Sequence, residues 1–389
     1  MEYNTIIIGA GAAGLMSANQ LENKNFLILE KTNYPGQKLL LTGNKRCNLT
    51  NLKTPKEFIS NIQYNQKFLY STINNYTPQD IYNYFNEYIP LKEESNNKIF
   101  PKSDKSTDIL NVLLKNIEEK IIYNEEVLSI SPINNLINIK TNNNEYITKN
   151  LIVATGGTSF KQTGSTGDII KFAKSLEIET IPFFAAETGI ILEEKIDLAG
   201  NSIDLVEINV DKIKTSGPLI YTHTGLSGES IMNISGYINC NKIKEITIDL
   251  LPSKNIENIK QELELNREKE LVTYLKKYYS TKISNQLINE IKLTNRIIKT
   301  LTHKEIETFI NNIKAHKYKI LKTNSIESAY VCGGGVKLNE VNTKTFQTLK
   351  YPNIYIVGEA LDIYGPIGGY NLTLAFSTAT NAALSINKM

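Results

Sequence analysis

The chain has 389 residues, of which 41% are apolar and 21% are charged, and its formal net charge is +3. These values exclude a collagen-like or disordered chain and leave room for two or three domains with a sizeable core. Because the sequence contains neither a signal-peptide pattern nor an apolar run of about 18 residues, we expect a cytoplasmic protein without a membrane partner. The three cysteines are far apart and show no CxxC spacing, so we expect neither disulfides nor a metal site.

An apolar, β-branched run at residues 5–8 leads directly into three glycines, Gly9, Gly11 and Gly14. They fit the pattern G-x-G-x-x-G at the start of an Ala-rich helical stretch. The first glycine permits a tight turn, the second lets a pyrophosphate approach the backbone, and the third lets helix pack on strand. The next apolar run ends at Glu30, about 20 residues after the glycines, where an acid hydrogen-bonds a ribose hydroxyl. The pattern predicts a dinucleotide site for NAD or FAD; the alternative is a glycine-rich turn without a ligand.

A glycine-bearing loop follows at 34–51 and is too irregular for one helix or strand. The spacing of apolar residues then predicts helices within 56–88 and 106–120. A pair of strands is expected at 121–140.

The second half of the chain begins with another buried strand and a Gly-Gly turn at 150–157, followed by a helix from Asp168, whose carboxylate we expect to cap it. Residues 186–252 alternate short β-like runs with turns, which indicates an antiparallel or barrel-like insertion. Residues 255–316 are expected to form several helices. A third strand with a glycine turn at 353–362 then precedes a final helix.

Three separate strand–glycine turns therefore occur in this chain. An NAD domain needs only the first, whereas an FAD molecule laid along a sheet edge requires later turns to hold its ribityl chain and ring. The final helix would begin at 368–371 and direct its N-terminus at a nearby anion. Such a helix end would stabilise the negative charge of a reduced flavin by roughly 0.3–1 kcal/mol when exposed. These features favour FAD.

The sequence resembles the BaiN/YhiN-type FAD-dependent oxidoreductase family, which includes aminoacetone-oxidase-like flavoproteins. The stretches that carry the resemblance are "IIIGAGAAGL", "GQKLLLTGNKRCNLTN", "ATGGTSFKQTGSTGD", "THTGLSG", "CGGGV" and "IYIVGEALDIYGPIGGYNL". The family implies an α/β fold with a discontinuous Rossmann-like FAD-binding domain at 1–185 and 323–389. It also implies two insertions, a β-barrel-like domain at 186–253 and a helical domain at 254–322.

The resemblance also implies which residues contact FAD. Those expected at the pyrophosphate and the adenosine are Gly9, Ala10, Gly11, Ala13, Gly14, Glu30, Lys31 and Val127. Those expected along the rest of the dinucleotide are Lys38, Arg46, Cys47, Asn48, Ala154, Thr155, Gly156, Gly157, Gly358 and Glu359. Those expected at the flavin ring are Gly369, Tyr370, Asn371 and Leu372.

Two stretches depart from the family pattern. Where many relatives have "GGGRCN", this chain has "GNKRCN" at 43–48, and "SGP" is replaced by "SGE" at 227–229. Cys47 is a catalytic candidate as a thiol at the flavin, with a small buried cysteine as the alternative. His223 is a candidate proton donor at neutral pH, with a turn histidine as the alternative. Arg46 is expected to contact FAD or an anionic substrate.

We predict an FAD-dependent oxidoreductase that transfers a hydride between flavin N5 and an organic substrate and reduces a C=C bond. A second dinucleotide motif is absent from the sequence, so NAD(P)H would have to dock transiently as the reductant. The alternatives are an RNA-directed reductase that makes dihydrouridine in ribosomal RNA, an amine-oxidase-like flavoprotein, and a non-catalytic flavin-binding redox sensor. The partner is accordingly a small molecule or RNA, and the sequence does not indicate an oligomeric state.

The segment 254–322 contains 15 Lys and Arg against 8 Asp and Glu, a balance of +7 that leaves −4 for the rest of the chain. A solvated helical surface would explain this excess. The alternative is a docking surface for RNA, with tyrosines as base-stacking groups. The residues of that hypothesis are Tyr274, Tyr278, Tyr279, Tyr318, Lys276, Lys277, Lys282 and Arg296.

Overall fold

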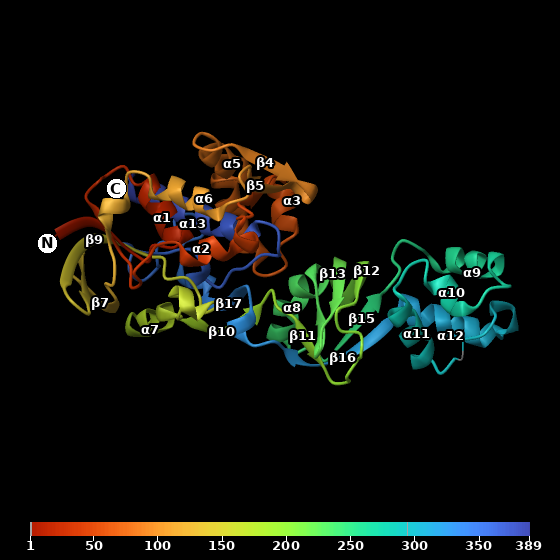
Figure 1. The fold of residues 1–389 in the computed structure, drawn as a ribbon. Coiled ribbons are helices and arrows are strands. Elements are labelled where there is room, and N and C mark those ends of the chain that lie inside the picture. Colours follow the sequence, from red (N-terminus) through yellow and green to blue (C-terminus); the bar gives the residue numbers. More distant parts are fainter. Residues whose placement is uncertain (1, 294) are drawn as a thin grey trace. The chain divides into compact units, whose positions relative to one another are not determined.

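A computed structural model describes residues 2–293 and 295–389. The chain forms two compact units (Figure 1). The first combines Met1–Ala185 with Ile326–Met389, and the second is Ala186–Ser325. Among the described residues, no helix has the length and apolar character needed to cross a membrane.

A seven-stranded sheet forms the centre of the first unit. Its order is β6 (Ile121–Ile122), β2 (Phe26–Leu29), β1 (Glu2–Ile8), β9 (Glu145–Val153), β8 (Leu136–Thr141) and β7 (Val127–Ile133), and β18 (Ile354–Ile356) also pairs with β9. The strands β2, β1, β9 and β18 run parallel, with Ile6 opposite both Leu27 and Leu151. Parallel strands buried on both faces are apolar throughout, which explains the continuous runs seen in the sequence.

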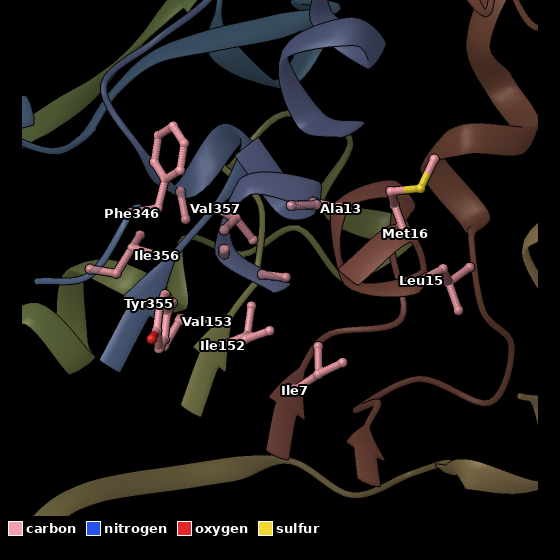
Figure 2. Close-up of a cluster of buried hydrophobic side chains, with 14 of the residues drawn as sticks. Ile7, Ala13, Leu15, Met16, Ile152, Val153, Phe346, Tyr355, Ile356 and Val357 are labelled. Atoms are coloured by element: carbon pink, nitrogen blue, oxygen red, sulfur yellow. The ribbon is translucent and has the colours of Figure 1, made fainter. Parts of the chain in front are cut away.

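Helices from opposite ends of the chain pack together in this unit. They are α1 (Ala12–Gln20) and α13 (Tyr370–Ile386), which lie side by side. Figure 2 shows Leu15 and Met16 of α1 in the same buried cluster as Ile152 and Val357. The first and last segments of the sequence therefore share one hydrophobic core.

The remaining elements of the first unit surround this core. Its helices are α2 (Gln37–Leu41), α3 (Pro55–Ser60), α4 (Leu69–Asn75), α5 (Pro78–Asn86), α6 (Ser106–Leu114) and α7 (Asp168–Ser175). Its further strands are β3 (Thr50–Asn51), β4 (Leu91–Glu94), β5 (Lys98–Pro101), β10 (Thr180–Ala186) and β17 (Val331–Val336). The small sheet β3–β5–β4 was not foreseen from the sequence. The cap expected for α7 is wrong: its N-cap is Gly167, and Asp168 instead forms an ion pair with Lys31.

The second unit contains a closed barrel with the order β11 (Ile190–Leu192), β14 (Gly225–Ser227), β13 (Ile213–Tyr221), β12 (Ser202–Val210), β15 (Glu245–Asp249) and β16 (His316–Thr323). Its helices are α8 (Glu229–Asn241), α9 (Ile256–Leu265), α10 (Leu271–Leu275), α11 (Thr281–Glu290) and α12 (His303–Lys314). The last four lie in sequence between two adjacent barrel strands, β15 and β16. Barrel and helices share one hydrophobic cluster. The strand β16, which the sequence analysis placed in the helical insertion, instead pairs with β15 and β11 and closes the barrel.

Three of the four tyrosines proposed as base-stacking groups are core residues instead, and the fourth, Tyr278, is half-buried against the same core. Tyr274, Tyr279 and Tyr318 are buried, and the hydroxyls of Tyr274 and Tyr278 donate to Glu262. The RNA-docking hypothesis is therefore wrong for Tyr274, Tyr279 and Tyr318, because rings packed inside the unit present no face to a nucleotide. Many of the lysines and arginines are also paired with carboxylates. Of the fifteen in 254–322, eight form ion pairs within the part of the chain that the structure describes, including two of the proposed phosphate contacts, Lys282 and Arg296.

His316 gives the second unit a testable pH dependence. The side chain is buried, with Nδ1 3.1 Å from Asn312 O, Nε2 3.6 Å from the Glu290 carboxylate, and its ring 4.5 Å from that of Tyr318. Burial lowers the pKa of His316 and outweighs the attraction of Glu290. The unfolded chain therefore takes up a proton near pH 6.5 that the folded chain takes up only at lower pH.

We predict that the free energy of unfolding falls as the pH drops below about 6.5, by up to about 1.4 kcal/mol per pH unit, until the lower pKa of the folded state is reached. In urea unfolding measured at several pH values, the His316→Gln variant should lack this pH-dependent part of the free energy of unfolding. The exposed His303 supplies the control, since His303→Gln should retain it. Equal pH slopes for the wild type and His316→Gln would contradict the prediction.

Candidate functional site

The first glycine turn joins β1 to α1, and each glycine has a separate reason to be there. Gly9 has a φ of +99°, and a Cβ on it would lie 2.6 Å from Ala154 O. A Cβ on Gly14 would lie 1.9 Å from Gly9 O, so only glycine lets the helix approach the turn. A Cβ on Gly11 would meet no atom within 4 Å. The backbone at Gly11, the N-cap of α1, is thus open to a ligand, as a bound pyrophosphate requires.

Glu30 directly follows β2 and holds the first turn in place. Its Oε2 accepts a hydrogen bond from Ala10 N–H at 2.8 Å, and its Oε1 accepts from Thr32 N–H and Oγ1–H at 2.8 and 2.7 Å. A carboxylate has about four acceptor directions, so one is left for a ribose hydroxyl. The next residue, Lys31, bonds Asp168 at 2.6 Å. Val127 lies buried at the start of β7.

The second and third glycine turns lie beside each other because β9 pairs with β18. Lys38 Nζ is 2.6 Å from Ser159 Oγ and 2.6 Å from Glu359 Oε2, while Glu359 Oε1 accepts from Cys332 N–H at 3.0 Å. A Cβ on Gly157 would lie 2.2 Å from Cys332 Sγ, which explains the glycine. Lys38 and Glu359, which were expected along the dinucleotide, thereby form one polar cluster. Its third member, Ser159, was not predicted from the sequence.

The turn residues Ala154–Gly157 also contain a buried hydroxyl that a cofactor would satisfy. Thr155 Oγ1 has no hydrogen-bond partner within the described part of the chain. Buried polar atoms are nearly always paired in native proteins, so an unpaired one marks a site for a missing partner. Together with the open backbone at Gly11, this hydroxyl fits a dinucleotide that lies across both turns.

The residues expected at the flavin ring lie around the start of α13. Gly369 is its N-cap in a left-handed conformation, and Asn371 binds both backbone groups of Gly365 through its amide. Leu372 follows in the same first turn. The Tyr370 ring is buried and stacks on Phe58, with its centroid 4.4 Å away. The first N–H groups of this helix have no intrahelical acceptors, which suits an anionic partner.

The two catalytic candidates differ in their surroundings. Cys47 is fully buried, and burial raises the pKa of its thiol to about 12, so the thiol is neutral at physiological pH. This favours the alternative of a small buried cysteine. His223 is exposed in the turn between β13 and β14 of the second unit.

Arg46 lies in a surface network rather than alone. It forms ion pairs with Glu94 and Asp104, and its guanidinium lies over the Phe100 ring, 4.3 Å from the centroid. Lys92 shares both carboxylates. These four charges are mutually compensated, so Arg46 would have to leave its partners to bind an anion.

Sequence reasoning missed Asp362, although it lies in the quoted stretch "IYIVGEALD". Its buried carboxylate accepts from the Tyr64 hydroxyl at 2.9 Å, from Asn65 Nδ2 at 3.1 Å and from Gly334 N–H at 2.7 Å. Burial raises the pKa of Asp362. The carboxylate ties the loop after Glu359 to β17, a connection between distant segments that no local pattern reveals.

The chain matches the model of the HI0933-like protein Rossmann domain over residues 3–385. The chain belongs to this family of FAD-binding flavoproteins. The resemblance drawn from the motifs is thereby confirmed, as are the Rossmann-type FAD domain and the assignment as an FAD-dependent oxidoreductase.

Curated relatives match nearly the full length. A ribosomal RNA dihydrouridine synthase of Haemophilus influenzae is 30% identical over 98% of both chains. Its namesake from Escherichia coli is 27% identical, over 97% of this chain and 96% of that one. A 3-dehydro-bile acid delta(4,6)-reductase of Clostridium scindens is 25% identical over 96% of both.

Among solved structures, a 3-ketosteroid-delta4-(5alpha)-dehydrogenase of Rhodococcus jostii aligns with a TM-score of 0.53 at 12% identity, covering all of this chain and 97% of that one. A flavocytochrome c3 fumarate reductase aligns with a TM-score of 0.52 at 12% identity, covering all of this chain and 78% of that one. At these identities the likeness shows the fold.

The two glycines of the first turn should respond differently to substitution. Gly11→Val should leave the thermal unfolding of the apoprotein unchanged but abolish FAD binding, because the new side chain enters the open space needed by the pyrophosphate. Gly14→Ala should instead lower the unfolding temperature, since its Cβ collides with Gly9 O. Flavin absorbance and apoprotein melting curves measure both effects. A Gly11→Val protein with full FAD content would show that the pyrophosphate lies elsewhere.

The loop before Cys47 contains a second testable feature. Gly43, Asn44 and Lys45 have φ of 55°, 55° and 68°, at positions where the family pattern has three glycines. A non-glycine residue in the left-handed region destabilises the folded state by about 1–2 kcal/mol. A glycine avoids this strain but loses about 0.4–1 kcal/mol through the greater entropy of the unfolded chain, which offsets part of the gain.

Lys45→Gly should therefore raise the free energy of unfolding by about 0.5–1 kcal/mol. The matched control is Lys171→Gly in helix α7, which removes the same exposed charge but should destabilise by about 0.5–1 kcal/mol. Chemical denaturation of both variants measures these changes in the free energy of unfolding. Destabilisation by both would mean that Lys45 is not strained.

Proposed function

We propose that this chain reduces the C5–C6 double bond of a uracil in ribosomal RNA, with FAD as its redox group and NAD(P)H as the reductant. The observation that supports a flavin-dependent reductase is that one unit contains the three glycine turns and the N-terminus of α13. The choice of RNA is supported by two relatives named as ribosomal RNA dihydrouridine synthases, which match at least 96% of each chain.

A small-molecule substrate is the second candidate. The bile acid reductase relative also matches 96% of both chains, and its name likewise specifies reduction of C=C bonds. In uracil, as in an unsaturated ketone, the double bond is conjugated with a carbonyl. Both candidates therefore require delivery of a hydride to one carbon and a proton to the other.

The residues of the site have distinct roles in this proposal. Bound FAD would supply the hydride through N5 after accepting electrons from NAD(P)H. Gly11 and the start of α1 hold the pyrophosphate, Glu30 holds the ribose, and Lys38 with Glu359 provides polar contacts between the second and third turns. The start of α13 stabilises negative charge at the ring.

An RNA substrate imposes two further demands. A stacked uracil must leave its neighbours, which costs a few kcal/mol and is least costly where the base is already unpaired. Contacts to phosphates can compensate this cost. The cations of 254–322 that form no ion pair among the described residues are the candidates for such contacts: Lys269, Lys276, Lys277, Lys292, Lys304, Lys319 and Lys322.

The test is mass spectrometry of nucleosides from ribosomal RNA incubated with the FAD-loaded protein and NADH or NADPH. We expect dihydrouridine to appear with the wild type and not with Gly11→Val. A parallel incubation offers an unsaturated 3-oxo steroid in place of RNA. Reduction of the steroid without any dihydrouridine would overturn the RNA assignment in favour of a small-molecule reductase, and reduction of neither substrate would overturn both.

A further inference from the structure

We propose that residues 48–51 form a clamp that positions the first turn of α13 and thereby tunes the redox potential of the bound flavin. The segment belongs to the stretch "RCNLTN", which is far in sequence from "GGYNL" at 368–372. The structure joins these two stretches through four residues, Asn48, Thr50, Asn51 and Thr373. The inference rests on FAD binding and is independent of the substrate.

The backbone of β3 lies directly against the N-cap of α13. Gly369 has a φ of +91°, and a Cβ on it would lie 2.5 Å from Thr50 C and 2.6 Å from Thr50 O. Asn48 reinforces this contact when its amide is oriented to satisfy both neighbours: Oδ1 then accepts from Gly369 N–H and Nδ2 donates to Thr50 O, both at 3.2 Å. Only glycine allows such an approach, so the helix start is held by close backbone packing.

A chain of buried hydroxyls adds a second connection. Thr373 Oγ1 donates to Gly369 O at 2.8 Å and lies 2.7 Å from Thr50 Oγ1; neither threonine is exposed. Because Thr373 has one hydroxyl proton and gives it to Gly369, Thr50 must be the donor in the bond between them. Thr50 thus bonds the first turn of the helix through its side chain.

Asn51 completes the clamp and also indicates a ligand. Its Nδ2 donates to Gly368 O at 3.2 Å and to Asn96 O at 2.9 Å. Its Oδ1 is buried without a partner within the described residues, although Asn51 as a whole is only 2% exposed. A buried acceptor beside the helix start is suited to an N–H donor of a bound ring. Pairing of β3 with β5 anchors the clamp to the small sheet.

The clamp affects redox chemistry through the helix dipole. The helix α13 has 17 residues, so its first turn carries the partial positive charge of a full macrodipole. A reduced flavin carries more negative charge than an oxidised one. Loosening the first turn of α13 therefore weakens binding of the reduced form more than binding of the oxidised form. We expect loss of the Thr50 bond to reduce the preference for reduced over oxidised FAD about two- to fivefold.

The experiment compares Thr50→Val, which removes the hydroxyl at nearly constant shape, with Thr50→Ser, which retains it. Midpoint potentials of the bound flavin are measured by dye equilibration, and affinity for oxidised FAD by fluorescence. Thr50→Val should shift the potential to a more negative value with unchanged affinity for oxidised FAD, whereas Thr50→Ser should behave like the wild type.

Ser377→Ala is the control for general damage to the helix. Ser377 is also buried on α13 and donates to Tyr76 O at 2.8 Å, farther along the helix. The Ser377→Ala variant should lower the stability of the protein without changing the midpoint potential of the bound flavin. If Thr50→Val fails to hold flavin, Thr373→Val removes the partner hydroxyl and replaces it in the titration. An unchanged potential, an equal shift in Ser377→Ala, or loss of flavin from both threonine variants would overturn the proposal.

Discussion

The cofactor site depends on the parallel pairing of β9 with β1 on one side and with β18 on the other. Parallel strands end at the same edge of a sheet, so three glycine turns that are far apart in sequence meet there. A single turn would bind a pyrophosphate, but it could not support both ends of FAD. The helices α1 and α13 pack beside each other because the strands that precede them belong to this sheet.

Three buried or partly buried acids hold the turns together. Glu30 accepts a backbone N–H from Ala10, Glu359 from Cys332, and Asp362 from Gly334. Each carboxylate thus bonds a segment remote from its own turn, so the polar groups of the site also stabilise its shape. Charge-assisted bonds of this kind are stronger than neutral ones, and removal of an acid would leave a buried N–H unpaired.

The second unit shows why charge and composition are weak guides to a binding surface. The excess of lysine and arginine in 254–322 is real, but eight of these residues form ion pairs with other described residues. Tyr274, Tyr279 and Tyr318 pack inward, since a barrel closed by β16 and covered by helices needs large side chains in its core. An RNA contact in this unit therefore rests on the exposed lysines and not on aromatic stacking.

The sequence by itself determined the parts of the protein whose causes are local. The strand, the three glycines, the helix and Glu30 lie within about thirty consecutive residues, and each turn requires glycine for reasons of backbone space. Motifs distributed over the full length of the chain indicated the family and the cofactor. Only the tertiary structure decided which groups face one another: Thr50 meets Thr373 across 323 positions, Lys38 meets Glu359 across 321, and Tyr274 is buried. Such contacts arise from strand order and close packing, which depend on the whole chain and leave no periodic pattern near the residues concerned.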